Sequence, residues 1–227
     1  MLVLAIDTAL AACSAAVLDT GRGAVVGRES LPMLRGQAEV LMPLVARVMD
    51  EAGVDFAALD RVAVTVGPGS FTGLRVGIAA ARGIALAAAK PAVGLSTLAA
   101  FAAPHIAADD TEPVVVAIDA RHGQVYLQVF GPAGRTLVSP RIASVREAIR
   151  AAGDGVTRIA GTAAELIAAA WPANQPLPAV IDARAAPDID WVARLGAAAS
   201  DRQGPPRPLY LRAPDAQPQD AARLPRR

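Results

Sequence analysis

The sequence has 227 residues, a formal net charge of +1, and hydrophobic residues at 53% of its positions. This length allows a buried core in one large or two small domains, and the small net charge argues against strong nonspecific nucleic-acid binding. A single cysteine, Cys13, excludes a disulfide within the chain and favours a reducing compartment. There is no basic leader, and the longest apolar run, residues 76–89, contains Arg82 and is too short to span a membrane. We therefore expect a cytoplasmic protein.

Strand and helix patterns alternate in the first half of the chain. Short apolar runs rich in β-branched residues are typical of strands, and apolar residues spaced three or four apart are typical of helices. Pro43 falls inside one helical pattern and is expected to kink it, and Asp55 is expected to cap a short helix. The expected elements are strands at 2–6, 13–18, 24–29, 62–66 and 92–95, and helices at 37–52, at 73–89, and from Ser96 or Thr97 onward.

The pattern then begins again after a polar, proline-bounded stretch at residues 109–113. Residues 115–121 read VVAIDAR where residues 3–9 read VLAIDTA, and a strand pattern follows each aspartate. This repeated order of strand, aspartate, turn and strand favours a duplicated lobe over chance. The remaining expected elements are strands at 125–130 and 158–160 and helices at 144–152, 163–171 and 187–199.

These patterns divide the chain into three parts. We expect an N-terminal lobe at 1–108, a C-terminal lobe at 109–205, and a tail rich in proline and arginine at 206–227. Composition predicts that the end of this tail is disordered and solvated rather than bound to nucleic acid.

Asp7 and Asp119, each at the end of a lobe's first strand, are the first candidate site. In a fold with two facing lobes they would face the cleft, where they could hold a hydrated Mg²⁺ beside a nucleotide phosphate. Alternatively, each carboxylate caps its own turn. A phosphate-binding hairpin would need glycine directly after the aspartate, but Thr8 follows Asp7 and only Gly123 serves the second turn. The turn-capping interpretation is therefore favoured.

The glycine-rich stretch GPGSFTG, residues 67–73, is the second candidate. It lacks the Lys-Ser/Thr pair of a P-loop and the G-x-G-x-x-G spacing of dinucleotide-binding proteins, and Pro68 removes one N–H donor. A tight strand-to-helix turn, capped by Ser70 or Thr72, is favoured over direct phosphate contact. At most, a vestigial nucleotide or phosphate site is expected, formed by Asp7, Thr8, Gly67, Gly69, Ser70 and Asp119.

Small residues recur along the 73–89 helix at a spacing that lets another helix approach closely. The alternative is packing against the protein's own sheet. A second apolar flank on the 37–52 helix is wider than one core contact requires, so the two helices together indicate a partner surface. The predicted interface residues are Met42, Ala46, Met49, Gly73, Leu74, Gly77, Ala80 and Ala81.

No complete catalytic set is recognisable. His105 and His122 are the only histidines and lack the spacing of a zinc or iron site. Cys13 is expected to be a core residue, and Ser70 lies outside a G-x-S-x-G context. We predict no catalytic residue, no metal site and no intrinsic cofactor.

Several segments together resemble the TsaB (YeaZ) family, which contains the bacterial partner subunit in tRNA threonylcarbamoyladenosine synthesis. They are LAIDT, RGQAEVLMPLV, VGPGSFTGLRVGIAAARGIA, GLSTLAA and IDARHGQVY. The resemblance implies an α/β protein with the actin/Hsp70/sugar-kinase-like ATPase fold, in which two ribonuclease-H-like lobes have mixed sheets flanked by helices. One departure is Gln37, where many relatives have histidine.

The resemblance also implies a function. It indicates a noncatalytic subunit that pairs with TsaD and TsaE for threonylcarbamoylation of adenosine 37 in tRNAs reading ANN codons. The helices of the N-terminal lobe would contact TsaD or form a homodimer. ATP or ADP with Mg²⁺, and tRNA, would be bound only through the complex, and no membrane would be involved. The alternative is an independent enzyme of the same fold, either a kinase-like ATPase or a glycoprotease-like peptidase.

Overall fold

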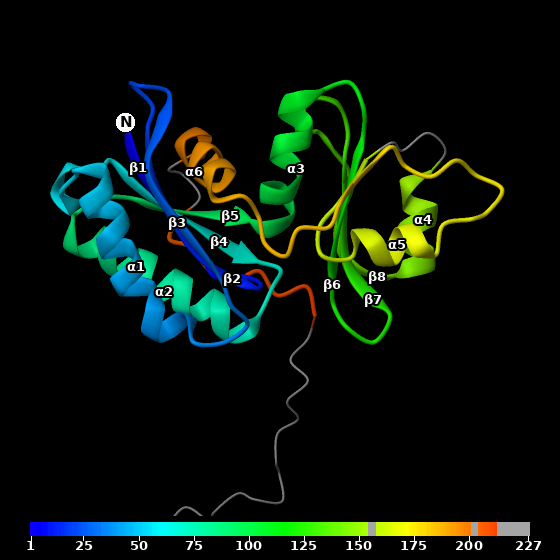
Figure 1. The fold of residues 1–227 in the computed structure, drawn as a ribbon, viewed down its shortest axis with the longest axis horizontal. Helices are drawn as coiled ribbons and strands as arrows, with labels where there is room; N and C mark the ends of the chain where they lie inside the picture. Colours follow the sequence, from blue (N-terminus) through cyan, green and yellow to red (C-terminus); the bar gives the residue numbers. More distant parts are fainter. Residues whose placement is uncertain (154–157, 201–203, 213–227) are drawn as a thin grey trace, which may run out of the picture.

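The computed structural model describes residues 1–153, 158–200 and 204–212, which form two lobes side by side (Figure 1). Each lobe is built on a five-stranded sheet. The first sheet contains β1 (Leu2–Asp7), β2 (Ala12–Asp19), β3 (Ala24–Pro32), β4 (Arg61–Gly67) and β5 (Ala92–Ser96). The second contains β6 (Val114–Asp119), β7 (Gln124–Phe130), β8 (Thr136–Ser144), β9 (Arg158–Ala160) and β10 (Val180–Asp182).

The two sheets have the same topology. Their strand orders are β3-β2-β1-β4-β5 and β8-β7-β6-β9-β10. In each, the first three strands form an antiparallel meander, and the fourth strand pairs in parallel with the first and the fifth. The central strands β1 and β6 are buried on both faces, which explains their unbroken apolar runs. The predicted duplication of strand, aspartate, turn and strand is confirmed.

Six α-helices and two short 3₁₀ helices lie in the described part of the chain. In the first half, α1 and α2 lie next to each other on one face of the first sheet (Figure 1). Helix α1 is continuous through Pro43, and the backbone bond that proline cannot make would go to Glu39 in the first turn; the expected kink remains a prediction. The helices are α1 (Gln37–Ala52), η1 (Phe56–Ala58), α2 (Phe71–Ala87), α3 (Thr97–Ala108), η2 (Pro132–Gly134), α4 (Val145–Ala152), α5 (Ala164–Ala169) and α6 (Ile189–Ala198).

The last helix of each half packs against the sheet of the other half. Helix α6 lies on β1, β2 and β4, where Gly196 is required because a Cβ there would lie 2.3 Å from the Cβ of Ala63. Helix α3 contacts β6 as well as its own sheet and buries Leu98 and Phe101 among the valines of β6. Figure 1 shows α3 between the two sheets. The two lobes therefore share core residues.

A buried arginine caps each of these exchanged helices. The Nη1 atom of Arg61, at the start of β4, donates to the carbonyl oxygens of Gly196, Ala197 and Ala199 at the end of α6. The guanidinium of Arg158, at the start of β9, donates to the carbonyl oxygens of His105 and Asp109 at the end of α3 and of Glu112 in the loop that follows. Because the last carbonyls of a helix lack backbone donors and carry negative partial charge, both arginines stabilise helix ends. The sequence patterns did not predict this pair.

The predicted division into two lobes and a tail does not correspond to separate units of the structure at every point. The boundary expected at 109–113 lies between α3 and β6, but α6 returns to the first sheet, so the lobes 1–108 and 109–205 remain a prediction. Strands β8 and β10 were not predicted. In the expected tail, Leu209 and Tyr210 contact the first lobe and Arg212 contacts the second, and residues 213–227 are outside the described part of the chain. None of the described helices has the length and hydropathy needed to cross a membrane.

Candidate functional site

Asp7 ends β1 in a fully buried position. Its Oδ1 atom accepts hydrogen bonds from Oγ1 of Thr65 at 2.5 Å and from the backbone N–H of Ala9 at 3.2 Å. The Oδ2 atom is buried without a hydrogen-bond partner among the described residues. Desolvation by burial raises the pKa of Asp7 to about 6. This enclosed carboxyl group does not fit a ligand of a hydrated Mg²⁺, which requires an accessible oxygen.

Two N–H donors of the glycine-rich turn after β4 form hydrogen bonds within the chain. The N–H of Ser70 donates to the carbonyl of Ala9 at 2.7 Å, and the N–H of Gly73 donates to Oγ of Ser70 at 3.3 Å. Ser70 is thus the N-cap of α2, as predicted. These two donors bond to the β1–β2 turn and to the helix cap. In a phosphate-binding loop, such N–H groups would instead be free to bind an anion.

Two glycines allow the β1–β2 turn to lie against the start of α2. A Cβ on Gly69 would be 2.4 Å from the carbonyl oxygen of Ala9, and a Cβ on Gly73 would be 2.1 Å from that of Thr8. The Thr8 hydroxyl also donates to the Gly73 carbonyl at 2.7 Å. These glycines therefore allow close backbone packing at a tight strand-to-helix turn, which is the interpretation favoured for the GPGSFTG sequence.

Most of the predicted partner-interface residues lie inside the first lobe. A Cβ on Gly77 would be 2.4 Å from Oγ1 of Thr8, so this glycine also permits packing against the β1–β2 turn. The buried members of the predicted set are Met49, Gly73, Leu74, Gly77 and Ala81. Met42 and Ala46 are exposed and Ala80 is partly exposed. The partner surface remains a prediction. Its accessible members, Met42, Ala46 and Ala80, lie on the outer sides of α1 and α2.

The corresponding turn of the second lobe is open. Asp119 is exposed, and its Oδ1 atom accepts from the N–H of Arg121 at 2.7 Å. The backbone of Arg121, His122 and Gly123 is left-handed, with φ values of 64°, 53° and 70°. This turn presents the Arg121 and His122 side chains to solvent.

The two turns and the start of α2 line one cavity of about 590 Å³ between the lobes. Of the six residues predicted as a vestigial phosphate site, Gly69, Ser70 and Asp119 line this cavity, and Asp7, Thr8 and Gly67 do not. The sequence reasoning missed three arginines in its wall: Arg35, Arg121 and Arg212. They come from three separate parts of the chain, so no local motif could reveal them.

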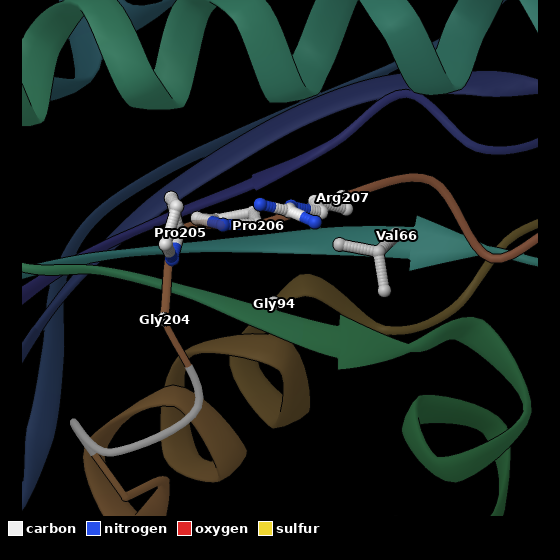
Figure 2. Close-up of a pocket in the computed structure, with 6 residues that line it drawn as sticks. All are labelled: Val66, Gly94, Gly204, Pro205, Pro206 and Arg207. Carbon is white, nitrogen blue, oxygen red and sulfur yellow. The ribbon is translucent and has the colours of Figure 1, made fainter.

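The described C-terminal segment, residues 204–212, runs from the first lobe to the second. Figure 2 shows Pro205, Pro206 and Arg207 beside β4, in a pocket that Val66 and Gly94 also line. Farther along, the N–H of Leu209 donates to the carbonyl of Val66 at 2.7 Å. Tyr210 and Arg212 continue this path: the Tyr210 ring stacks on Phe71, and Nη1 of Arg212 donates to the carbonyl of Ala120 in the second lobe.

Cys13 and His105 were the other side chains considered for catalysis, and both pack within the fold. Cys13 is fully buried in the core, as predicted, and burial raises the pKa of its thiol to about 11, so it is not a ready nucleophile. Nε2 of His105 lies 3.0 Å from Oδ2 of Asp182, where it joins α3 to β10. Within residues 1–153, 158–200 and 204–212, no group of three or more His, Cys, Asp or Glu side chains could hold a metal ion.

Comparison with known proteins relates this arrangement to tRNA modification. Residues 33–184 match the family described as "TsaD: tRNA N6-adenosine threonylcarbamoyltransferase". The tRNA threonylcarbamoyladenosine biosynthesis protein TsaB of Escherichia coli is 38% identical over 126 residues, which cover 56% of this chain and 53% of that protein. The chain thus matches about half the length of this curated relative.

Two further comparisons extend over nearly the whole chain. An uncharacterized protein of Mycobacterium tuberculosis is 35% identical over 223 residues, covering 95% of this chain and 94% of that protein. YeaZ from Pseudomonas aeruginosa has a TM-score of 0.74 and 30% identity, covering 92% of this chain and 99% of that structure. The expected fold class is confirmed, and the chain belongs to the TsaB/YeaZ family.

Proposed function

We propose that this chain is a noncatalytic partner subunit that pairs with TsaD, and with TsaE, in the threonylcarbamoylation of adenosine 37 in tRNAs reading ANN codons. The names of the relatives support a role in this pathway. In this proposal the chain has no intrinsic cofactor, and ATP or ADP with Mg²⁺ is bound only in the complex.

The observation that carries the proposal is the closed turn of the first lobe. The N–H of Ser70 is bonded to Ala9, and Asp7 is buried beneath the same turn with its carboxylate bonded to Thr65. A kinase-like ATPase would need these groups for phosphate and for a metal-bound water. Here they hold the lobe together, which favours the partner subunit over the independent ATPase.

The outer side of α1 and α2 supplies the proposed contact with TsaD. Met42 is 47% exposed and Ala46 is exposed on the same face of α1, one turn apart. Ala80 is partly exposed on α2, which packs beside α1. Two helices of this length can supply the area of about 800 Å² per partner that a stable interface requires. The same surface could serve a homodimer when TsaD is absent.

Reconstitution tests the proposal. The chain should restore tRNA modification when it is added to TsaD and TsaE, as measured by nucleoside analysis of the tRNA. Ala46→Glu should abolish co-purification with TsaD and this restoration, because a charge would enter a close helix contact. The matched control is Ala169→Glu, which places the same charge on an exposed position of α5. Loss of pairing in both variants, or in neither, would contradict the assigned surface, and failure of the unaltered chain to restore modification would contradict the function.

A further inference from the structure

Three arginine side chains converge on the cavity between the lobes. Arg35 precedes α1, Arg121 lies in the β6–β7 turn, and Arg212 is the last described residue of the C-terminal segment. Among the described residues that line the cavity, Asp119 is the only acidic one. Because the formal net charge of the whole chain is only +1, the cavity is a local concentration of positive charge.

Two of these guanidinium groups are available to a ligand. Arg35 and Arg121 are exposed, and within the described part of the chain neither side chain has an ion-pair or hydrogen-bond partner. Arg212 is positioned by its bond to the carbonyl of Ala120, in the same turn as Arg121. Guanidinium groups bind phosphate oxygens with paired, charge-assisted hydrogen bonds, so three of them around one cavity favour a ligand with more than one phosphate.

The remaining wall of the cavity fits the other parts of a nucleotide. Tyr126 contributes aromatic surface, whereas the ring of Phe71 is already in contact with Tyr210 and Arg75. Ser70 and Thr162 contribute hydroxyl groups, each of which accepts one backbone N–H and keeps its own proton to donate. The Asp119 carboxylate can accept a hydrogen bond from a ribose hydroxyl or from an amino group of a base. An acidic peptide would bring carboxylates but no planar ring system and no ribose. Planar bases, ribose and phosphates together are the components that proteins bind in single-stranded RNA.

The arrangement favours an RNA strand over a free nucleoside triphosphate. A triphosphate concentrates its charge and is usually held by several backbone N–H groups of one loop. Here two N–H groups of the glycine-rich turn, those of Ser70 and Gly73, are already bonded to Ala9 and to the Ser70 side chain. The arginines instead come from three segments, which suits the separated phosphates of a polynucleotide chain.

We propose that the cavity between the lobes binds a single-stranded segment of the tRNA substrate, with Arg35, Arg121 and Arg212 contacting its phosphates. The choice of tRNA as the source of this RNA rests on the proposed function. The proposal differs from the expectation that tRNA is bound only through the complex, because it places a direct contact between this chain and the tRNA.

The test is RNA binding by the full chain. A fluorescently labelled tRNA reading an ANN codon is titrated with the unaltered protein, with Arg35→Gln/Arg121→Gln, and with the control Arg146→Gln/Arg150→Gln on α4. Both double variants remove two positive charges from exposed positions. We expect the first to weaken binding about tenfold or more and to lower the slope of log affinity against log salt by about 1.4, and the control to change affinity less than about twofold. Unlabelled single-stranded RNA should compete, whereas ATP should not.

Three results would overturn the proposal: absence of measurable tRNA binding, equal losses in both double variants, or displacement by ATP with the same arginine dependence. The last would assign the cavity to a free nucleotide. Each variant is also added to TsaD and TsaE. If modification is restored while tRNA affinity is insensitive to Arg35 and Arg121, the RNA contact fails and the proposed function stands. If affinity falls as expected but the unaltered chain restores no modification, the proposed function fails and the RNA contact stands.

Discussion

The two lobes repeat one arrangement but use it differently at the end of the central strand. Asp7 and Asp119 both end the strand at the centre of a five-stranded sheet and precede a turn into the next strand. In the first lobe this turn is bonded to the start of α2, and Asp7 is buried. In the second lobe the turn is open, and Asp119 faces the cavity between the lobes. In a duplicated fold, one turn can therefore be held in place by packing while the equivalent turn stays accessible to a ligand.

The features that the lobes share should be equally sensitive to mutation. Arg61→Leu and Arg158→Leu each remove hydrogen bonds to three backbone carbonyls at or shortly after the end of a helix, so each should lower the free energy of unfolding by about 4 kcal/mol. Urea unfolding measures this effect, with the exposed Arg146→Leu as the control. A cost below about 1 kcal/mol in either lobe would mean that these arginines do not hold the exchanged helices.

The close contact at the first turn can be broken with a single methyl group. Gly73→Ala places a Cβ 2.1 Å from the carbonyl oxygen of Thr8, and the required backbone shift should cost about 3 kcal/mol. Gly83→Ala is the control in the same helix, since its Cβ would have no neighbour within 4 Å and alanine favours a helix. Equal stability of the two variants in thermal unfolding would show that the β1–β2 turn does not rest on α2.

The buried aspartate of the first lobe should make the stability of the protein depend on pH. The pKa of Asp7 is raised from 3.8 to about 6 in the folded protein, so the folded state binds this proton more tightly than the unfolded state. The resulting stabilisation is present in full below pH 3.8 and is lost as pH rises through about 6. The whole effect is about 3 kcal/mol, of which about 2 kcal/mol falls between pH 4 and pH 7.5.

Asp7→Asn should remove this part of the pH dependence, because an amide does not titrate in this range. The measurement is urea unfolding of the unaltered protein and of Asp7→Asn at pH 4 and pH 7.5. If both proteins show the same change in stability between these pH values, the buried carboxyl group is not the origin of the pH dependence.

Much of the fold could be predicted because its signals are local. The runs at 2–6 and 62–66 are central strands with apolar residues on both faces, and the repeated AID sequence marks the same place in both lobes. Strand β8 was missed because Pro140 interrupts it and most of its residues are at least partly exposed. The exchange of α3 and α6, and the arginines that cap them, depend on pairs more than 45 residues apart, as the contacts of Arg158 with α3 show.

The candidate site was harder to predict for the same reason. The spacing of Gly73 and Gly77 is the same whether a partner helix or the chain's own backbone approaches them, and the deciding neighbour, Thr8, is distant in sequence. The three arginines of the cavity are likewise separated along the chain and meet only in the folded structure. Local patterns thus identified the two turns but could not show which one is closed.

We infer that the closed turn of the first lobe leaves this chain alone without a site for phosphate chemistry. ATP hydrolysis by the isolated protein, compared with Asp7→Ala and with the mixture containing TsaD and TsaE, tests this inference. The account predicts no turnover above the buffer background for the isolated protein, with or without Asp7. Robust turnover by the isolated protein that is abolished by Asp7→Ala would contradict it.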